Sequence, residues 1–342
     1  MSQADNHIRW AGQPGHYEVW YLTGNHRDSD TGYWIRYTLE SPLPGHGDPY
    51  AQLWFAFFDA RDPGNNVAFN RRYDIGQLEA GKDPFVVTIA DAELTHQSAR
   101  GSLSSTIDSS DRRASWDLRW QPSAETHHHL PSLMYLRGGL GETTVLAPNL
   151  DIAVSGVIRC GDRTFELDDQ PFGQTHLWGK KHAHRWAWGH CTAFDDRPGA
   201  AFEILSVCLK RAGQVLPPLT IFTLYLDGEV HSFNEFHHTP ITRSRTRTAR
   251  FAFSASGLRT RIEGEFTCRP EDMVVAPYVD PDGEPSYCAN TEVADLNITV
   301  FERSGFTGWR EKARIQSSRR GHFELGQRER DTAIVADHVT VE

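Results

Sequence analysis

Apolar and polar residues alternate along much of the chain, with the period of two that is typical of β-strands. In residues 33–39, Tyr33, Ile35, Tyr37 and Leu39 share one side, while the other side is more polar. A strand with one buried face is expected from this pattern, because successive side chains of a strand point to opposite faces.

The same alternation predicts further strands over residues 17–24, 51–59, 85–94, 114–120, 151–159, 201–210, 219–228, 249–257, 258–266 and 295–303. Clusters of Gly, Pro, Asn and Asp bound these segments, as turns require. Helical periodicity is scarce, and one short helix is expected near residues 130–136. The sequence therefore predicts an all-β protein built from barrels or sandwiches.

The strand pattern is weakest over residues 125–148, where Pro, Gly and His gather. A chain of 342 residues is long enough for two domains. We therefore predict an N-terminal β domain over residues 1–140 and a C-terminal β domain over residues 141–342. The run His127–His129 lies in this expected linker and is given no function.

Composition excludes several classes of protein. No run approaches the roughly twenty apolar residues that a membrane helix needs, and the first twenty residues lack the basic and apolar regions of a secretory signal. A cytoplasmic location without a membrane span is therefore predicted. Five widely spaced cysteines without a CxxC motif are expected to be reduced thiols.

The net charge of −10 disfavours a nucleic-acid partner, because it repels a phosphate backbone. Residues 243–250 form a short basic run, which is interpreted as a solvated strand face.

The most unusual stretch is residues 173–191, which hold four histidines, three tryptophans and two lysines. If a strand runs from residue 182 onward, one of its faces consists only of imidazole and indole rings. The residues on that face are His182, His184, Trp186, Trp188 and His190. Such a face predicts a wide, aromatic barrel interior that suits a large apolar ligand.

Three interpretations of these histidines stay open. His182, His184 and His190 could bind a metal ion, since alternate strand residues can point at one ion, although no facial-triad carboxylate or HExxH motif accompanies them. One or two histidines could instead transfer protons. Most of them could also be hydrogen-bonded core residues.

Several short segments resemble the lipocalin-like family that includes AttH-type proteins, carotenoid 1,2-hydratase and, more distantly, tocopherol cyclase. They are Tyr17–Leu22, Ala147–Gly156, Gly161–Leu167, the His-x-Trp-Gly segment Gly173–Gly179, and the Trp-x-Trp strand at Trp186 and Trp188. The resemblance implies two lipocalin-like (calycin) antiparallel β-barrel domains, packed together, with a pocket at or near their junction. It also implies protonation of an alkene or prenyl chain, followed by capture of the carbocation by water or an internal hydroxyl.

The resemblance assigns pocket positions to the His-x-Trp-Gly and Trp-x-Trp residues. Glu203 takes the place of a Tyr or Asp acid in the related hydratases, and it could equally be a solvent-facing partner of Lys210 or Arg211. The candidate set is His176, Glu203 and His184 for catalysis, and Trp20, Trp178, Trp186, Trp188, His190 and Tyr225 for substrate binding.

The favoured hypothesis is an acid–base hydratase, cyclase or isomerase without organic cofactor, acting on a hydrophobic isoprenoid or polyketide-like molecule. A second hypothesis is a non-catalytic lipid or terpenoid carrier, because the same architecture can serve for binding alone. A third is a metal enzyme that uses His182, His184 and His190.

Overall fold

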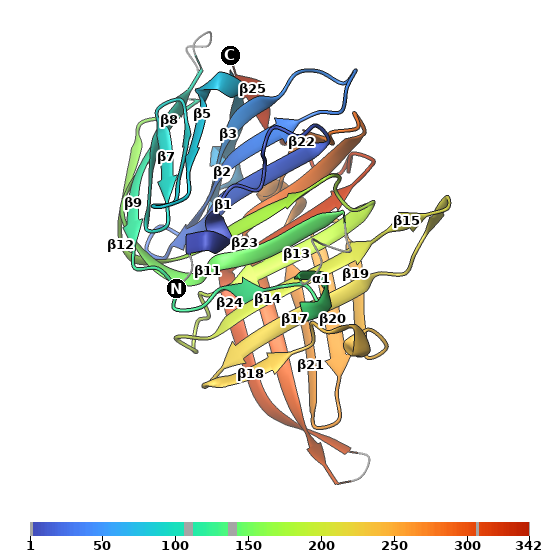
Figure 1. Cartoon of the computed structure of the whole chain (residues 1–342). Helices are drawn as coiled ribbons and strands as arrows, with labels where there is room; N and C mark the ends of the chain where they lie inside the picture. Colours follow the sequence, from blue (N-terminus) through green and yellow to red (C-terminus); the bar gives the residue numbers. More distant parts are fainter. Residues whose placement is uncertain (1–2, 106–111, 136–141, 306–307, 342) are drawn as a thin grey trace.

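A computed structural model describes residues 3–105, 112–135, 142–305 and 308–341 of the chain. Strands dominate it, and nearly all of them belong to two large sheets that lie against each other (Figure 1). The all-β class expected from the alternating pattern is confirmed.

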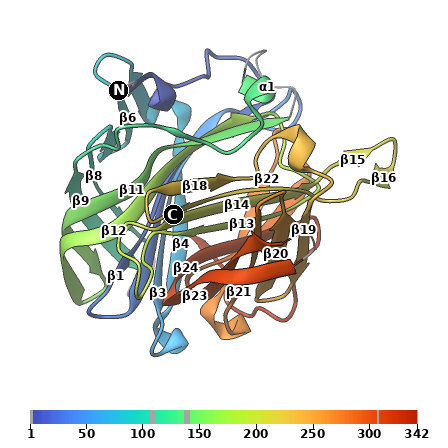
Figure 2. The same cartoon turned by 90° about the horizontal axis from the view of Figure 1, so that it is seen from below.

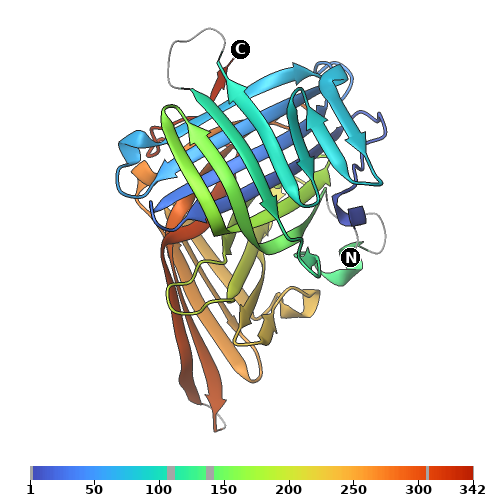
Figure 3. The same ribbon diagram turned by 90° about the vertical axis from the view of Figure 1, so that its left-hand side faces the viewer.

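The N-terminal sheet has thirteen strands, antiparallel except for the pair β25 and β4. Their spatial order is β25 (Val339–Val341), β4 (Val67–Asp74), β3 (Tyr50–Asp59), β2 (Thr31–Ser41), β1 (His16–His26), β12 (Arg163–Gly179), β11 (Thr143–Cys160), β9 (Arg113–Trp120), β8 (Ser98–Ser104), β7 (Ala92–Thr95), β6 (Val86–Ile89) and β5 (Leu78–Gly81), with β10 (His127–His128) paired to β11. Figure 3 shows these strands crossing the face of the molecule.

The C-terminal sheet has ten antiparallel strands. Their order is β18 (Glu229–Ser232), β17 (Leu219–Leu226), β14 (Ala201–Cys208), β13 (Arg185–Cys191), β24 (Gly308–Gln327), β23 (Pro285–Ser304), β21 (Thr260–Thr267), β20 (Arg250–Ser256) and β19 (Thr242–Arg247), with β22 (Val274–Val279) paired to β23. A separate hairpin of β15 (Lys210–Arg211) and β16 (Gln214–Val215) projects from the molecule (Figure 2).

Helical structure in the described residues is confined to short elements. They are α1 (Ser132–Tyr135) and the 3-10 turns η1 (Gln3–Asn6), η2 (Pro63–Asn65), η3 (Ile75–Gln77), η4 (Phe236–His238) and η5 (Pro270–Asp272). The short helix expected near residues 130–136 corresponds to α1, and residue 136 lies outside the described residues.

The sequence alternation sends neighbouring side chains of one strand into different cores. On β1, Trp20 and Leu22 pack in the core of the N-terminal sheet, whereas Tyr17, Val19 and Tyr21 face a junction core shared with the C-terminal sheet. Both faces of β1 are therefore buried. The C-terminal sheet encloses a core of its own, rich in phenylalanine.

The two sheets approach closely where β2 meets β23. A Cβ placed on Gly32 would lie 2.5 Å from the Cβ of Glu292, so only glycine fits there without a shift. Nearby, the Asn25 side chain donates to the Glu292 carbonyl at 2.7 Å and hydrogen-bonds His322 Nε2 at 2.8 Å. The junction is thus a packed and hydrogen-bonded interface.

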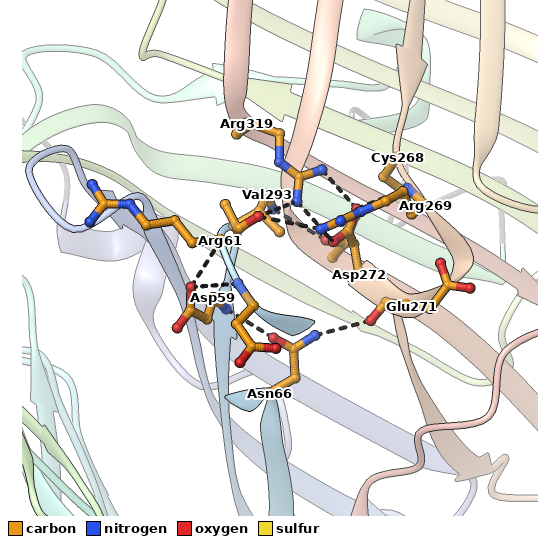
Figure 4. Close-up of polar contacts among 12 residues, drawn as sticks. Asp59, Arg61, Asn66, Cys268, Arg269, Glu271, Asp272, Val293 and Arg319 are labelled. Atoms are coloured by element: carbon orange, nitrogen blue, oxygen red, sulfur yellow. Dashed lines mark hydrogen bonds and ion pairs between the residues drawn. The ribbon is translucent and has the colours of Figure 1, made fainter. Parts of the chain in front are cut away.

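A second polar contact joins the halves at the turn after β3 (Figure 4). The buried carboxylate of Asp272 is held by Arg269 and Arg319, each at 2.7 Å. Both guanidinium groups also donate to the carbonyl of Ala60, at 3.3 and 3.0 Å. Because Asp272 is paired on both sides, its charge is compensated inside the interface.

Most expected strands are present, with two differences in detail. The segment 85–94 forms two strands, β6 and β7, because the chain turns at Ala90, whose φ is +53°. The strand expected from residue 182 begins only at Arg185. The basic run 243–250 lies on β19 and the start of β20, and its arginines are exposed as expected of a solvated face.

The chain passes from one sheet to the other between Gly179 and Arg185, after β11 and β12 have joined the N-terminal sheet. Sheet membership therefore changes later than the domain boundary that we predict between residues 140 and 141. We propose that the unit boundary follows sheet membership and lies in residues 180–184. Cys191, Cys208, Cys268 and Cys288 are free thiols.

Candidate active site

A pocket opens at the junction of the two sheets, and its walls come from both. Its empty space, including the part continuous with solvent, is about 1140 Å³. Leucine and valine side chains form much of the wall. The aromatic residues of this junction pocket are Tyr17, Tyr21, Trp34, Trp186, Trp188 and Tyr278. An apolar, aromatic wall of this kind suits a hydrophobic molecule.

Strand β13 supplies the two central indoles through its alternation. Trp186 and Trp188 face the junction pocket, while the small residues Ala187 and Gly189 face the phenylalanine core behind the strand. The tryptophan-rich face therefore lines the space between the two sheets, and the expectation of a barrel interior is wrong. The large rings lie on this face because Phe266 and Ile204 fill the space against the opposite face of β13.

Glu324 on β24 presents a half-buried carboxyl group to the same pocket. Its Oε1 accepts a hydrogen bond of 2.8 Å from Trp186 Nε1, and its Oε2 lies 3.4 Å from Cys288 Sγ. Burial raises the pKa of Glu324, and the hydrogen bonds from Trp186 and Cys288 only partly oppose that effect. The neutral acid thus persists to higher pH than it does for an exposed glutamate.

His182 lines the junction pocket from the loop before β13. Its Nδ1 lies 2.6 Å from Oδ1 of Asp280, whose side chain is fully buried. Burial alone would raise the pKa of Asp280, but hydrogen bonds from His182 and Arg328 lower it below the ordinary value. The pocket therefore contains both a carboxyl with a raised pKa and a histidine held by a carboxylate.

Glu203 on β14 lies at the centre of a buried cluster. His129 Nε2 is 2.7 Å from its Oε1, His190 Nδ1 is 2.7 Å from its Oε2, and Trp188 Nε1 also donates to it. Burial alone would raise the pKa of Glu203, but the charges and hydrogen bonds of His129 and His190 lower it well below the ordinary range. This carboxylate is ionised, so it is poorly suited to the acid role expected from the sequence.

The alternative expectation for Glu203, a solvent-facing partner of Lys210 or Arg211, is wrong. Its side chain is only 2% exposed and its partners are histidines. His129 comes from the segment expected to be a functionless linker, which the structure places against the core of the C-terminal half.

His176 and Trp20 meet away from the junction pocket, on the paired strands β12 and β1. Their rings stack at 4.8 Å, and His176 Nε2 lies 2.9 Å from Glu18 Oε1. Trp178 packs beside His176 and beneath the guanidinium of Arg9. These three candidates form a polar cluster near η1, and none of them lines the junction pocket.

The remaining candidates occupy other positions. His184 lies on a polar surface pocket beside the junction pocket. His190 is buried between Glu203 and the stacked ring of His322. Tyr225 hydrogen-bonds His127 at 2.9 Å, in the neighbourhood of the Glu203 cluster.

The alternative metal set is not brought together. His182 pairs with Asp280, whereas His190 pairs with Glu203. Over residues 3–105, 112–135, 142–305 and 308–341, no group of three or more His, Cys, Asp or Glu side chains has the arrangement of a metal site. The same ranges contain no helix that is long and apolar enough to cross a membrane.

Sequence reasoning missed Glu324, Asp280 and His129. Glu324 had a local signal: in residues 321–326, Phe323 and Leu325 alternate with it, which puts it on the face opposite the apolar residues. The links from Asp280 to His182 and from His129 to Glu203 join residues that are distant in the sequence. Only the packing of the two halves reveals them.

Comparison with known proteins supports the family resemblance. A family model described as tocopherol cyclase-like matches residues 83–327. Two uncharacterized proteins of Mycobacterium tuberculosis, from strains CDC 1551 and H37Rv, are each 30% identical to this chain over 305 residues, which is 86% of this chain and 84% of each relative.

Two solved structures are also similar. A Nitrosomonas europaea protein described as an AttH superposes with a TM-score of 0.53 at 13% identity, covering 92% of this chain and 93% of that one. Kievitone hydratase from Nectria haematococca gives a TM-score of 0.43 at 10% identity, covering 94% of each chain. The AttH likeness establishes the two-domain, lipocalin-like all-β fold. Because the family model spans well over half of the chain, this protein belongs to the tocopherol cyclase-like family.

Proposed function

We propose that this protein is a hydratase, cyclase or isomerase that acts on a hydrophobic isoprenoid or polyketide-like molecule in the junction pocket, by acid–base chemistry without an organic cofactor. The observation that carries the proposal is the carboxyl of Glu324, half-buried in an aromatic pocket and with a raised pKa. Membership of the tocopherol cyclase-like family supports a reaction of this type.

Glu324 takes the acid role in place of Glu203. A carboxylic acid held neutral by burial can transfer its proton to a carbon–carbon double bond, which an ionised carboxylate cannot do. Glu324 lies within hydrogen-bonding distance of Trp186 and lines the pocket directly. Glu203 is ionised and paired with two histidines, so it has no proton to give.

The indoles of Trp186 and Trp188 remain the proposed substrate-binding surface. Protonation of a trisubstituted alkene produces a tertiary carbocation, and the electron-rich face of an indole stabilises a nearby cation by about 0.5–2 kcal/mol. The apolar walls keep bulk water away from this cation. We do not assign His176, Trp20 or Trp178 to the reacting molecule, because they lie outside the pocket.

The test compares wild-type protein with Glu324→Gln, both purified without an affinity tag. Small molecules extracted from each are identified by mass spectrometry, and each protein is then incubated with the compounds recovered. The proposal expects wild-type protein to interconvert two compounds related by water or by isomerisation, and Glu324→Gln to bind the same compounds without converting them. One unchanged compound in both proteins would establish a carrier and overturn the proposal.

A further inference from the structure

His182 stands between two pockets of opposite character. One is the apolar junction pocket, which also contains Glu324. The other is a polar surface pocket, here called the vestibule, whose walls include Lys181, Lys210, Arg328, Glu142, Glu284 and His184. His182 lines both. Its ring therefore lies where a hydrophobic guest and water from the surface can meet.

Asp280 fixes the orientation and the tautomer of His182. Its Oδ1 accepts hydrogen bonds from His182 Nδ1 at 2.6 Å and from the His182 backbone N–H at 3.0 Å. An ionised carboxylate can only accept, so Nδ1 carries the proton and Nε2 of the neutral ring keeps its lone pair. Among the described residues, no hydrogen bond engages this Nε2.

Arg328 fixes Asp280 in turn. Its Nη1 donates to Asp280 Oδ2 at 2.6 Å, and its Nη2 donates to the His182 carbonyl at 2.8 Å. The loop that carries His182 is thus held at its backbone and its side chain by one ion pair. A histidine oriented by a buried carboxylate, with its second nitrogen free, has the arrangement of a general base.

Aromatic rings surround the imidazole on its faces. Tyr17, Trp186 and Tyr278 stack on His182 with ring centroids 4.5, 5.2 and 5.3 Å away. These electron-rich faces stabilise the imidazolium that forms when Nε2 accepts a proton. The negative charge of Asp280 acts in the same direction.

We propose that His182 is the general base of the site and that the reaction it completes is hydration of an alkene, which rests on the acid role of Glu324 proposed above. Glu324 gives its proton to one alkene carbon, and the carbocation forms on the other. A water molecule from the vestibule forms the C–O bond, and its proton passes to His182 Nε2. Loss of that proton to solvent and reprotonation of Glu324 restore the site, so the net change is addition of water.

The first experiment uses a phenol bearing a 3-methylbut-2-enyl chain, incubated in H₂¹⁸O and separately in D₂O. Wild-type protein is expected to form the tertiary alcohol with one ¹⁸O atom. In His182→Gln, kcat for the alcohol is expected to fall at least about 100-fold, as loss of a general base requires, with KM little changed. Deuterium exchange into the alkene continues in this variant, because Glu324 still protonates the substrate.

Control variants separate the two proposals. Glu324→Gln is expected to lose both alcohol formation and deuterium exchange, whereas His237→Ala, an exposed histidine of η4 outside both pockets, keeps both. Free imidazole restores alcohol formation to His182→Ala. The base role is overturned if His182→Gln loses exchange and hydration equally, or if imidazole does not rescue. Full activity of Glu324→Gln refutes the proposed function instead.

A chemical-labelling experiment tests the role of His182 even if the prenylated phenol is not converted. Diethyl pyrocarbonate attacks unprotonated imidazole nitrogens, and peptide mass spectrometry locates the modified histidines. His182 is expected to react faster than the buried His190 and to be protected when the prenylated phenol is bound. A His182 that does not react, or that reacts equally with the probe present, contradicts an accessible base in this pocket.

Discussion

Glu203 and Glu324 flank strand β13 on its two neighbouring strands, and each accepts an indole N–H from it: Trp188 donates to Glu203, and Trp186 donates to Glu324. Their surroundings push the two pKa values apart. The histidines around Glu203 lower its pKa, whereas burial raises that of Glu324. Two carboxyl groups with opposite shifts can serve different roles in one protein.

The raised pKa of Glu324 predicts the pH dependence of activity. An acid must be protonated to act, so kcat is expected to fall as the pH rises through the raised pKa. Glu324→Gln should lower kcat by about 100-fold or more at every pH, with a melting temperature close to that of the wild type. A pH series of kcat for both proteins checks this. A wild-type rate that increases across the same range is incompatible with Glu324 as the acid.

Trp186→Phe tests the contact between Trp186 and Glu324 directly. The indole hydrogen bond lowers the pKa of Glu324, so its loss should raise that pKa further and move the alkaline limb of kcat to higher pH. Trp188→Phe is the matched control, because the Trp188 N–H goes to Glu203 and the limb should stay in place. If the limb moves equally in both variants, the pKa of Glu324 is controlled by loss of an indole ring and not by loss of the hydrogen bond from Trp186.

The lowered pKa of Glu203 predicts the acid stability of the fold. An unfolded glutamate titrates near pH 4.3, so the pairing with His129 and His190 stabilises the protein above that pH and is lost as the pH falls through the lower folded value. Glu203→Gln is expected to cost about 3–5 kcal/mol of unfolding free energy near neutral pH, and to flatten the acid limb in urea unfolding.

Glu292 provides a control of opposite sign. Burial raises its pKa, so its contribution is present at low pH and is lost as the pH rises through the folded value. Glu292→Gln should therefore gain stability relative to the wild type at alkaline pH. If both variants respond to pH in the same direction, the assigned shifts are wrong.

Gly326→Ala is expected to disturb the pocket by displacing the Trp186 ring, although it replaces no titratable residue. A Cβ at Gly326 would overlap the indole of Trp186, so the ring must move. Overpacking of this kind costs about 1–3 kcal/mol, and the tryptophan fluorescence spectrum should change with it. Gly76→Ala is the control, since nothing lies within 4 Å of the added carbon. Unchanged fluorescence in Gly326→Ala would show that the indole is not held against β24.

Sequence alternation predicted the strands and the shared face of Trp186, Trp188 and His190, because both follow from the period of two within a single strand. It did not predict which core that face would meet. Ala187 and Gly189 have small side chains on the opposite face of the strand. A strand with two buried faces, however, gives no sign of which face lies at the junction.

The candidate site was predictable only where its chemistry is local. Glu203 was a candidate because of the family resemblance, yet its charge state depends on His129, which is 74 residues away in the chain. Asp280 looks like an ordinary turn residue in the sequence. It is part of the site because its Oδ1 lies 2.6 Å from Nδ1 of His182, although the two residues are 98 positions apart in the chain. Contacts of this range arise only when the chain has folded.

Strand β25 pairs in parallel with β4, so residues 339–341 complete the edge of the sheet that begins the chain. During translation, every other described strand has left the ribosome before this one. The N-terminal sheet therefore waits with one edge of β4 unpaired until the C-terminal half has been made. An exposed strand edge can pair with the edges of other chains. The nascent protein is therefore most in need of a chaperone before residues 339–341 have been made.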